Sequence, residues 1–118
     1  MAKVLSACRT GRVLLTRTAI LKCAGYEVIA ATTVGAALAA LQLESIKVAV
    51  IGHLYTTDEK NTIAAKAHQV GAKVLCVHDE PEPPEVVADD FIFNLDRPEL
   101  LLSRVAALLD AQRQGAVG

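Results

Sequence analysis

Residues 46–53 read Ile-Lys-Val-Ala-Val-Ile-Gly-His, and this stretch decides the fold. Its first six residues are apolar and mostly β-branched, except for Lys47. A strand that is apolar on both faces is typical of the centre of a parallel sheet that helices cover on both sides. The apolar run ends at Ile51, so Gly52 and His53 are expected at the carboxyl end of a central parallel strand.

On either side of this run, short β-branched segments alternate with longer segments of helical period, which indicates βαβ units in a single α/β domain. We expect strands at Lys3–Cys8, Tyr26–Ala31, Ile46–Ile51, Lys73–Val77 and Phe91–Phe93. We expect helices at Arg12–Ala24, from Val34 to Leu41, from residue 57 to Val70, and after Asp96.

The ends and inner faces of these helices follow from local patterns. Leu14, Thr18 and Leu21 are expected to share the buried face of the first helix. Thr56, followed three residues later by Glu59, predicts a capping box at the start of the third helix.

Residues 78–85 and 112–118 are expected to lie outside the helices and strands. Residues 78–85 contain three prolines and four acidic residues, so we expect a loop there. Asp96 is expected to cap the last helix, with Pro98 in its first turn. Residues 112–118 have nothing to bury, so we expect a domain over residues 1–111 and a disordered tail over 112–118.

Composition narrows the class of protein. The chain has 118 residues, of which 53% are hydrophobic, so it is long enough for one domain and too short for two. A net charge of −1 argues against nucleic acid or an anionic membrane as a partner. The three cysteines, of which Cys23 and Cys76 are expected in the core, make no disulfide framework and favour a reducing, cytoplasmic compartment.

Three short motifs occur in order along this pattern: Gly-Tyr-Glu-Val at 25–28, Ala-Asp-Asp-Phe at 88–91 and Arg-Pro-Glu-Leu-Leu at 97–101. With the five βα pairs, they resemble a bacterial response regulator receiver domain over nearly the whole chain. The resemblance implies a CheY-like, flavodoxin-like parallel sheet of order 2-1-3-4-5 with helices on both faces and a crevice at the carboxyl ends of the strands. The family's fourth helix is expected to be shortened or absent, because residues 79–87 are few and rich in proline.

The resemblance also indicates which positions should carry chemistry. Receivers accept a phosphoryl group on an Asp that ends the third strand. An acidic pair that ends the first strand holds Mg²⁺, a hydroxyl residue ends the fourth strand and a Lys ends the fifth. In this sequence the acidic pair is replaced by Cys8 and Arg9, the acceptor by His53, the hydroxyl residue by Val77 (or His78 in a register shifted by one), and the Lys by Asn94.

These replacements predict a degenerate receiver, or pseudo-receiver, that is not an enzyme and holds no cofactor. A thiol and a guanidinium are not the hard oxygen ligands that Mg²⁺ requires, and Arg9 would repel the ion. The expected function in two-component or phosphorelay signalling is therefore contact with another signalling protein, independent of phosphorylation. A homodimer remains open, although the reshaped fourth-helix face would not copy the family's usual dimer.

The alternative is a flavodoxin-like domain that binds a small ligand or a metal in the strand-end crevice. Cys8, His53 and His78 offer a thiolate and two imidazoles, which suit zinc or copper. No two of them have the spacing of a metal motif, which favours the reading without a metal.

Two further polar residues are open to interpretation. Arg9, beside the start of the first helix, can bind an anion, but an ion pair with Asp58 or Asp79 is favoured. His68 is expected to be solvated on the exposed side of the third helix.

Overall fold

The computed structural model describes residues 2–52, 54–79, 84–93 and 98–117, with side chains described as far as Ala111. Its elements, in chain order, are β1 (Lys3–Ala7), α1 (Gly11–Cys23), β2 (Glu27–Ala31), α2 (Val34–Leu43), β3 (Val48–Ile51), α3 (Thr57–Gln69), β4 (Lys73–His78), β5 (Asp90–Phe93) and α4 (Pro98–Val117). The five predicted strands are all present.

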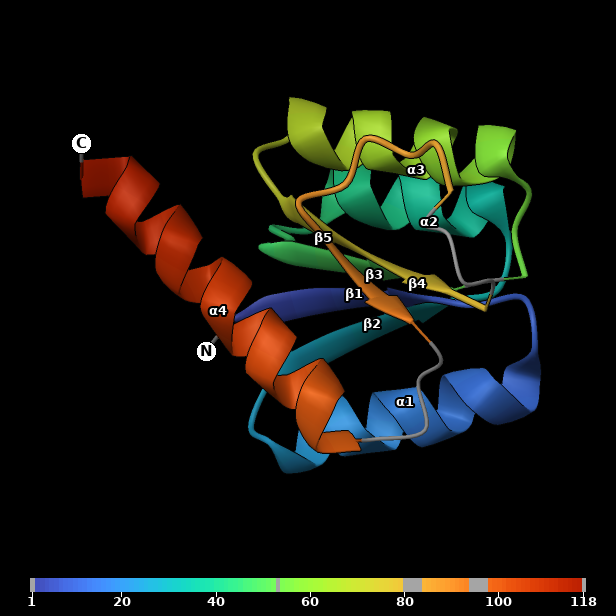
Figure 1. Ribbon diagram of the computed structural model, residues 1–118, viewed down its shortest axis with the longest axis horizontal. Helices are drawn as coiled ribbons and strands as arrows, with labels where there is room; N and C mark the ends of the chain where they lie inside the picture. Colours follow the sequence, from blue (N-terminus) through green and yellow to red (C-terminus); the bar gives the residue numbers. More distant parts are fainter. Residues whose placement is uncertain (1, 53, 80–83, 94–97, 118) are drawn as a thin grey trace.

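The strands form one parallel sheet in the order β2-β1-β3-β4-β5, which confirms the predicted topology. Helices α2 and α3 cover one face of the sheet, and α1 and α4 cover the other (Figure 1). Every residue of β3 is buried, as its apolar sequence predicts.

Alternate residues of the central strands enter two separate cores. On the α2–α3 side the core contains Ala49 and Ile51 of β3, and on the α1–α4 side it contains Val48 and Val50. Because side chains alternate across a strand, this one short run supplies both cores.

The inner face of α1 differs from the one that the sequence pattern predicts. Leu14 and Leu21 are buried as expected, but the third buried residue is Arg17, and Thr18 is only half-buried. Positions three and four residues apart lie on the same side of a helix, so either residue fits the spacing. Arg17 becomes important for the site described below.

The connection between β4 and β5 also follows the prediction from its prolines. Its described residues, 79 and 84–89, contain no helix. Asn61 of α3 holds the second half of this connection: its Nδ2 donates to the Glu85 carbonyl oxygen at 2.8 Å, and its Oδ1 accepts from the Val87 amide at 3.1 Å.

Asp89 then leads the connection into β5. Its Oδ2 accepts a hydrogen bond from the Val74 amide at 2.7 Å and lies 2.8 Å from Nε2 of His68, which is therefore paired and not simply solvated. The Asp89 amide donates back to the Val74 carbonyl oxygen at 2.9 Å. Partial burial raises the pKa of Asp89, but the hydrogen bonds from His68 and Val74 outweigh it, so the pKa is lowered overall.

The end of the chain departs from expectation. Helix α4 runs to Val117 and projects beyond the sheet, whereas the sequence predicts a disordered tail from residue 112 (Figure 1). Residues 110–114, Asp-Ala-Gln-Arg-Gln, contain no helix breaker, so local propensity allows the helix to continue. Among the described helices, none combines the length and apolarity that a membrane span needs.

We predict that Asp89→Ala lowers the free energy of unfolding by about 1–2 kcal/mol at pH 7, because the Val74 amide loses its charged acceptor. Since the pKa of Asp89 is lower in the folded protein, its contribution is complete above the unfolded value of about 3.9 and is lost as the pH falls through the folded value. Urea unfolding of both proteins at a series of pH values should therefore show the difference shrinking below about pH 4. The exposed Asp79→Ala is the control, and an equal loss in that variant would contradict the prediction.

The capping box gives a second prediction. Thr56 Oγ1 accepts from the Glu59 amide at 3.1 Å, and Glu59 Oε1 accepts from the Thr56 amide at 2.9 Å. Thr56→Ala should lower the free energy of unfolding by about 1 kcal/mol, because one amide at the start of α3 loses its acceptor. Denaturant unfolding measures the loss. The neighbouring exposed Thr57→Ala should change it by less, and a reversed order would refute the role given to Thr56.

Candidate functional site

The carboxyl ends of β1 and β3 are held side by side. The Gly52 amide, one residue beyond β3, donates to the Ala7 carbonyl oxygen at 2.8 Å. Cys8, one residue beyond β1, donates its amide to the Ala31 carbonyl oxygen at 3.0 Å, and it is 0% exposed. Cys8, which the sequence predicts to stand at the first position of the receiver acidic pair, is therefore a fully buried thiol.

Arg17 of α1 completes this corner. A Cβ added to Gly52 would lie 3.1 Å from the Ala7 carbonyl oxygen and 3.3 Å from both Nη1 of Arg17 and Sγ of Cys8, so the three groups crowd around this glycine. Arg17 is 2% exposed, and its Nε and Nη1 have no hydrogen-bond partner within the described part of the chain. Burial lowers the pKa of this guanidinium, an effect that the neighbouring Cys8 partly opposes.

Arg9 lies outside this corner, in an ion pair. Its Nη1 donates to both carboxylate oxygens of Glu59, at 3.1 and 3.3 Å, and its guanidinium carbon lies 6.0 Å from the centre of the Tyr55 ring. The predicted pairing of Arg9 with an acid is thus right, but the partner is Glu59 instead of Asp58 or Asp79. The capping box explains the choice, because it fixes the Glu59 carboxylate at the start of α3.

Tyr55 ties the same region to β2. Its hydroxyl donates to the Thr32 carbonyl oxygen at 2.9 Å, and the residue is buried. Burial raises the pKa of Tyr55 to about 12, so the phenol remains a neutral donor at physiological pH. Arg9, Tyr55 and Glu59 together connect the ends of β1, β2 and β3.

At the other end of the site, Val77 and His78 both belong to β4 and are buried. The His78 ring stacks on Phe93, with centroids 5.4 Å apart, and meets the edge of Phe91 at 6.1 Å. Neither β4 residue offers the hydroxyl that receivers have at this position.

The described residues include some of the predicted site residues and leave out others. His53 and Asn94 lie outside the described residues, so neither the phospho-acceptor position nor the lysine position is tested. Within the described residues, no three His, Cys, Asp or Glu side chains come together as metal ligands. Cys76 is buried as expected, and burial raises its pKa, but Cys23 is exposed, which corrects its assignment to the core.

Two residues of the site region escape the sequence pattern. Arg17 and Lys60 are cationic, yet both are buried. Lys60 lies on the inner face of α3, where its charge slightly opposes the raised pKa of Cys76. Only their spacing indicates that they are buried. Arg17 follows Leu14 by three residues and Lys60 precedes Ile63 by three, so each shares a helix face with an apolar residue. Of the two, Arg17 is the one that reaches the corner beside Cys8 and Gly52.

No protein-family model matches this sequence, and comparison with curated proteins gives no match. Solved structures do match. The CheY-like receiver domain protein of Methanospirillum hungatei is 22% identical, with 98% of each chain covered and a TM-score of 0.84. The chemotaxis protein CheY4 of Vibrio cholerae is 23% identical, with 92% of this chain and 99% of that chain covered and a TM-score of 0.80.

A third match is the receiver-modulated diguanylate cyclase of Pelobacter carbinolicus, at 15% identity, with 100% of both chains covered and a TM-score of 0.84. Identities this low establish the arrangement of the backbone. The chain therefore has the fold of the CheY-like response regulator receiver domains.

Proposed function

We propose that this chain is an atypical receiver domain of two-component or phosphorelay signalling, which acts by contacting another protein without being phosphorylated or catalysing a reaction. The receiver fold supports the first part of the proposal. The corner formed by Cys8, Arg17 and Gly52 is the observation that supports the second.

Receiver phosphorylation needs a divalent cation at the strand ends, and this corner is unsuited to one. Mg²⁺ requires oxygen ligands in near-octahedral geometry, whereas Cys8 offers a buried sulfur. Arg17 adds a fixed positive charge beside it. Two unit charges of like sign at 4 Å repel by about 4 kcal/mol at an effective dielectric constant of 20, and the double charge of Mg²⁺ doubles that repulsion.

The second acidic position is equally altered. Arg9 stands there, and its charge is already paired with Glu59. If a metal displaced this pair to recruit Glu59, it would break the capping box of α3, because the same carboxylate accepts the Thr56 amide. The two changes together favour a receiver in which the fold remains and the metal-dependent chemistry is lost.

The partner that we propose is another signalling protein. Among the matched structures, one is the N-terminal domain of a response regulator, sensory box and GGDEF protein, and another is the receiver of an HD domain-containing protein. Receivers in those proteins are joined to other signalling modules. The three cysteines of this chain are free, which supports the reducing compartment of the cytoplasm as the place of this contact.

Phosphoryl transfer tests the proposal directly. We predict that incubation with acetyl phosphate and Mg²⁺ leaves the intact mass unchanged, and that beryllofluoride with Mg²⁺ leaves the melting temperature unchanged, because no acidic cluster binds the cation. A receiver that retains its acidic pair and acceptor Asp, treated in parallel, should respond to both reagents. A mass increase of one phosphoryl group in this chain, at His53 or elsewhere, would refute independence from phosphorylation.

A further inference from the structure

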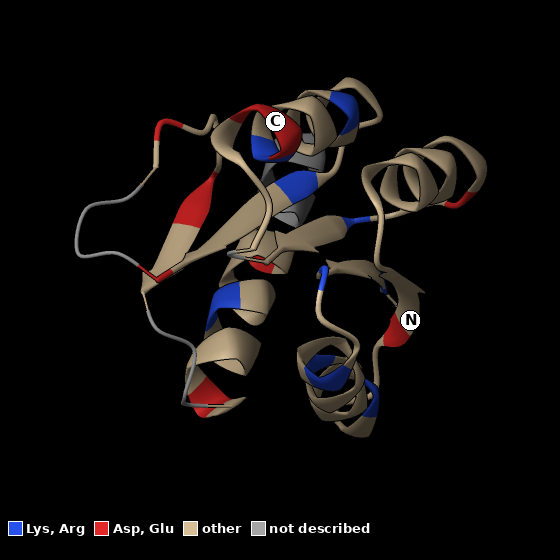
Figure 2. Ribbon diagram, turned by 90° about the vertical axis from the view of Figure 1, so that its right-hand side faces the viewer, with Lys and Arg blue, Asp and Glu red and all other residues tan. Residues whose placement is uncertain are grey.

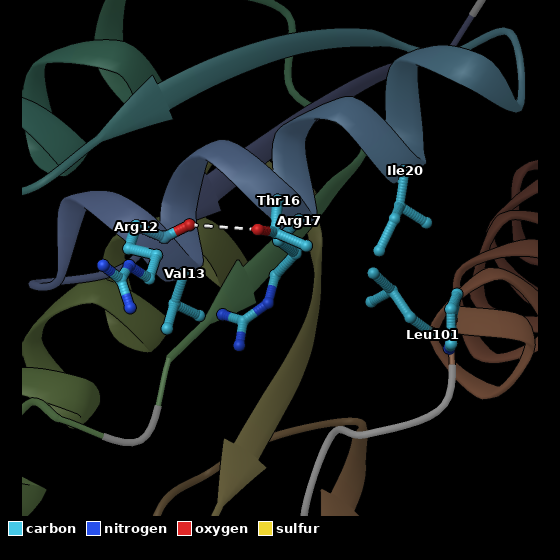
Figure 3. Close-up of a pocket in the computed structure, with 7 residues that line it drawn as sticks. Arg12, Val13, Thr16, Arg17, Ile20 and Leu101 are labelled. Carbon is cyan, nitrogen blue, oxygen red and sulfur yellow. Dashed lines mark hydrogen bonds between the residues drawn. The ribbon is translucent and has the colours of Figure 1, made fainter.

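A cavity of about 290 Å³ lies between α1 and the first turns of α4. Val13 and Ile20 of α1 and Leu101 of α4 supply apolar walls, while Arg12 and Arg17 supply two guanidinium groups. Figure 3 shows the side chains of Arg12, Val13 and Arg17 on the same side of α1, with Ile20 facing Leu101 farther along the helix. The cavity is thus apolar at one end and basic at the other.

Within the described part of the protein, Cys8 only partly offsets the burial of the Arg17 charge, and no carboxylate forms an ion pair with it. The residue is 2% exposed, and two of its three guanidinium nitrogens, Nε and Nη1, have no hydrogen-bond partner there. An ionised group that is buried without a partner is strongly unfavourable, and arginine cannot relieve the cost by losing its proton at physiological pH. Such a group beside a cavity favours an anionic ligand there.

The surroundings of Arg17 specify the sign and the site of that partner. Helix α1 carries three charged residues, Arg12, Arg17 and Lys22, and all are basic (Figure 2). Among the described residues that line the cavity, none is acidic. Helix α4 begins at Pro98, which also lines the cavity, so the positive end of its dipole adds to the same field.

The shape and polarity of the cavity narrow the ligand further. Its volume equals that of about ten water molecules, which suits a small organic molecule better than a bare ion. One buried positive charge is neutralised by one negative charge, which favours a monoanion. The planar fork of a guanidinium matches a carboxylate with two parallel hydrogen bonds.

We propose that the α1–α4 cavity binds a small amphipathic carboxylate. Its carboxylate pairs with Arg17, Arg12 attracts it from the exposed side, and its apolar body packs on Val13, Ile20 and Leu101. The cavity reaches the strand ends through Arg17, whose Nη1 packs beside Cys8 and Gly52. A ligand in the cavity would therefore change the electrostatic potential at the corner formed by Cys8, Arg17 and Gly52. The inference rests on the receiver fold and the cavity, and it holds whether or not the chain is phosphorylated.

Octanoate is the probe that tests this site. Titration calorimetry should detect octanoate binding to the intact chain, and the ligand should raise the melting temperature. Octanol, which has the apolar body without the charge, and inorganic phosphate, which has charge without the apolar body, should do neither at the same concentrations. A phosphate effect as large as that of octanoate would refute the amphipathic class, and the absence of any octanoate effect would refute the site.

Variants assign the binding to Arg17. Arg17→Met keeps the length of the side chain and should weaken octanoate binding by about tenfold or more, since it removes the charged hydrogen bonds. It should also raise the melting temperature of the ligand-free protein, because an uncompensated buried charge is gone. The matched control is Arg104→Met, which removes an α4 guanidinium that pairs with Asp90 and does not line the cavity. Equal octanoate affinity in the two variants would overturn the proposal.

Two more variants keep the test decisive if Arg17→Met does not fold. Thr16→Phe, at an exposed residue that lines the cavity, should reduce octanoate affinity while leaving Arg17 in place. Cys8→Ala examines whether the neighbouring cysteine side chain already serves as the partner of Arg17. If octanoate binds Cys8→Ala and not the unmodified chain, Cys8 already occupies the arginine and the proposal fails. Similar octanoate affinity in both supports it.

Discussion

The hydrogen bond from the Gly52 amide to the Ala7 carbonyl oxygen fixes the geometry on which the site depends. It continues the pairing of β1 and β3 by one residue beyond the sheet, so Cys8 and Gly52 emerge side by side. Because Gly52 has no side chain, Arg17 of α1 can reach the same point. The parallel arrangement of two buried strands thus brings together a thiol, a bare backbone and a guanidinium from three separate elements.

Two arginines lie near the carboxyl end of β1 on a backbone that has the receiver fold. Cys8 and Arg9 follow β1, at the positions where we propose that they replace the receiver acids, and Arg17 of α1 reaches the same corner as Cys8. The guanidinium of Arg17 is a fixed positive charge in this corner. Unlike a metal, it cannot dissociate, so the electrostatic state of this region depends on what binds the arginine rather than on cation concentration.

The sequence predicts the fold well because the fold depends on repeated, local signals. The apolar run of β3, the capping box of α3 and the prolines before β5 each act over a few residues, and each has the predicted outcome within the described chain. The site is predicted less well because it depends on whether Arg17 or Thr18 is the residue of α1 that faces the core. Both residues have a helical spacing that fits the buried Leu14 and Leu21. Hydrophobicity favours Thr18, whereas the structure buries Arg17. Arg9 could be given an acidic partner from the sequence, but only the cap geometry selects Glu59.

The attachment of the β4–β5 connection to α3 has a mechanical consequence. In this chain the Asn61 side chain, with one donor and one acceptor bond, holds the backbone at Glu85 and Val87, where a receiver would have a helix of its own. Two hydrogen bonds from one side-chain amide thus hold a segment that receivers hold with a helix. A protein that bound this stretch would therefore pull on α3 through the side chains of Asn61 and His68.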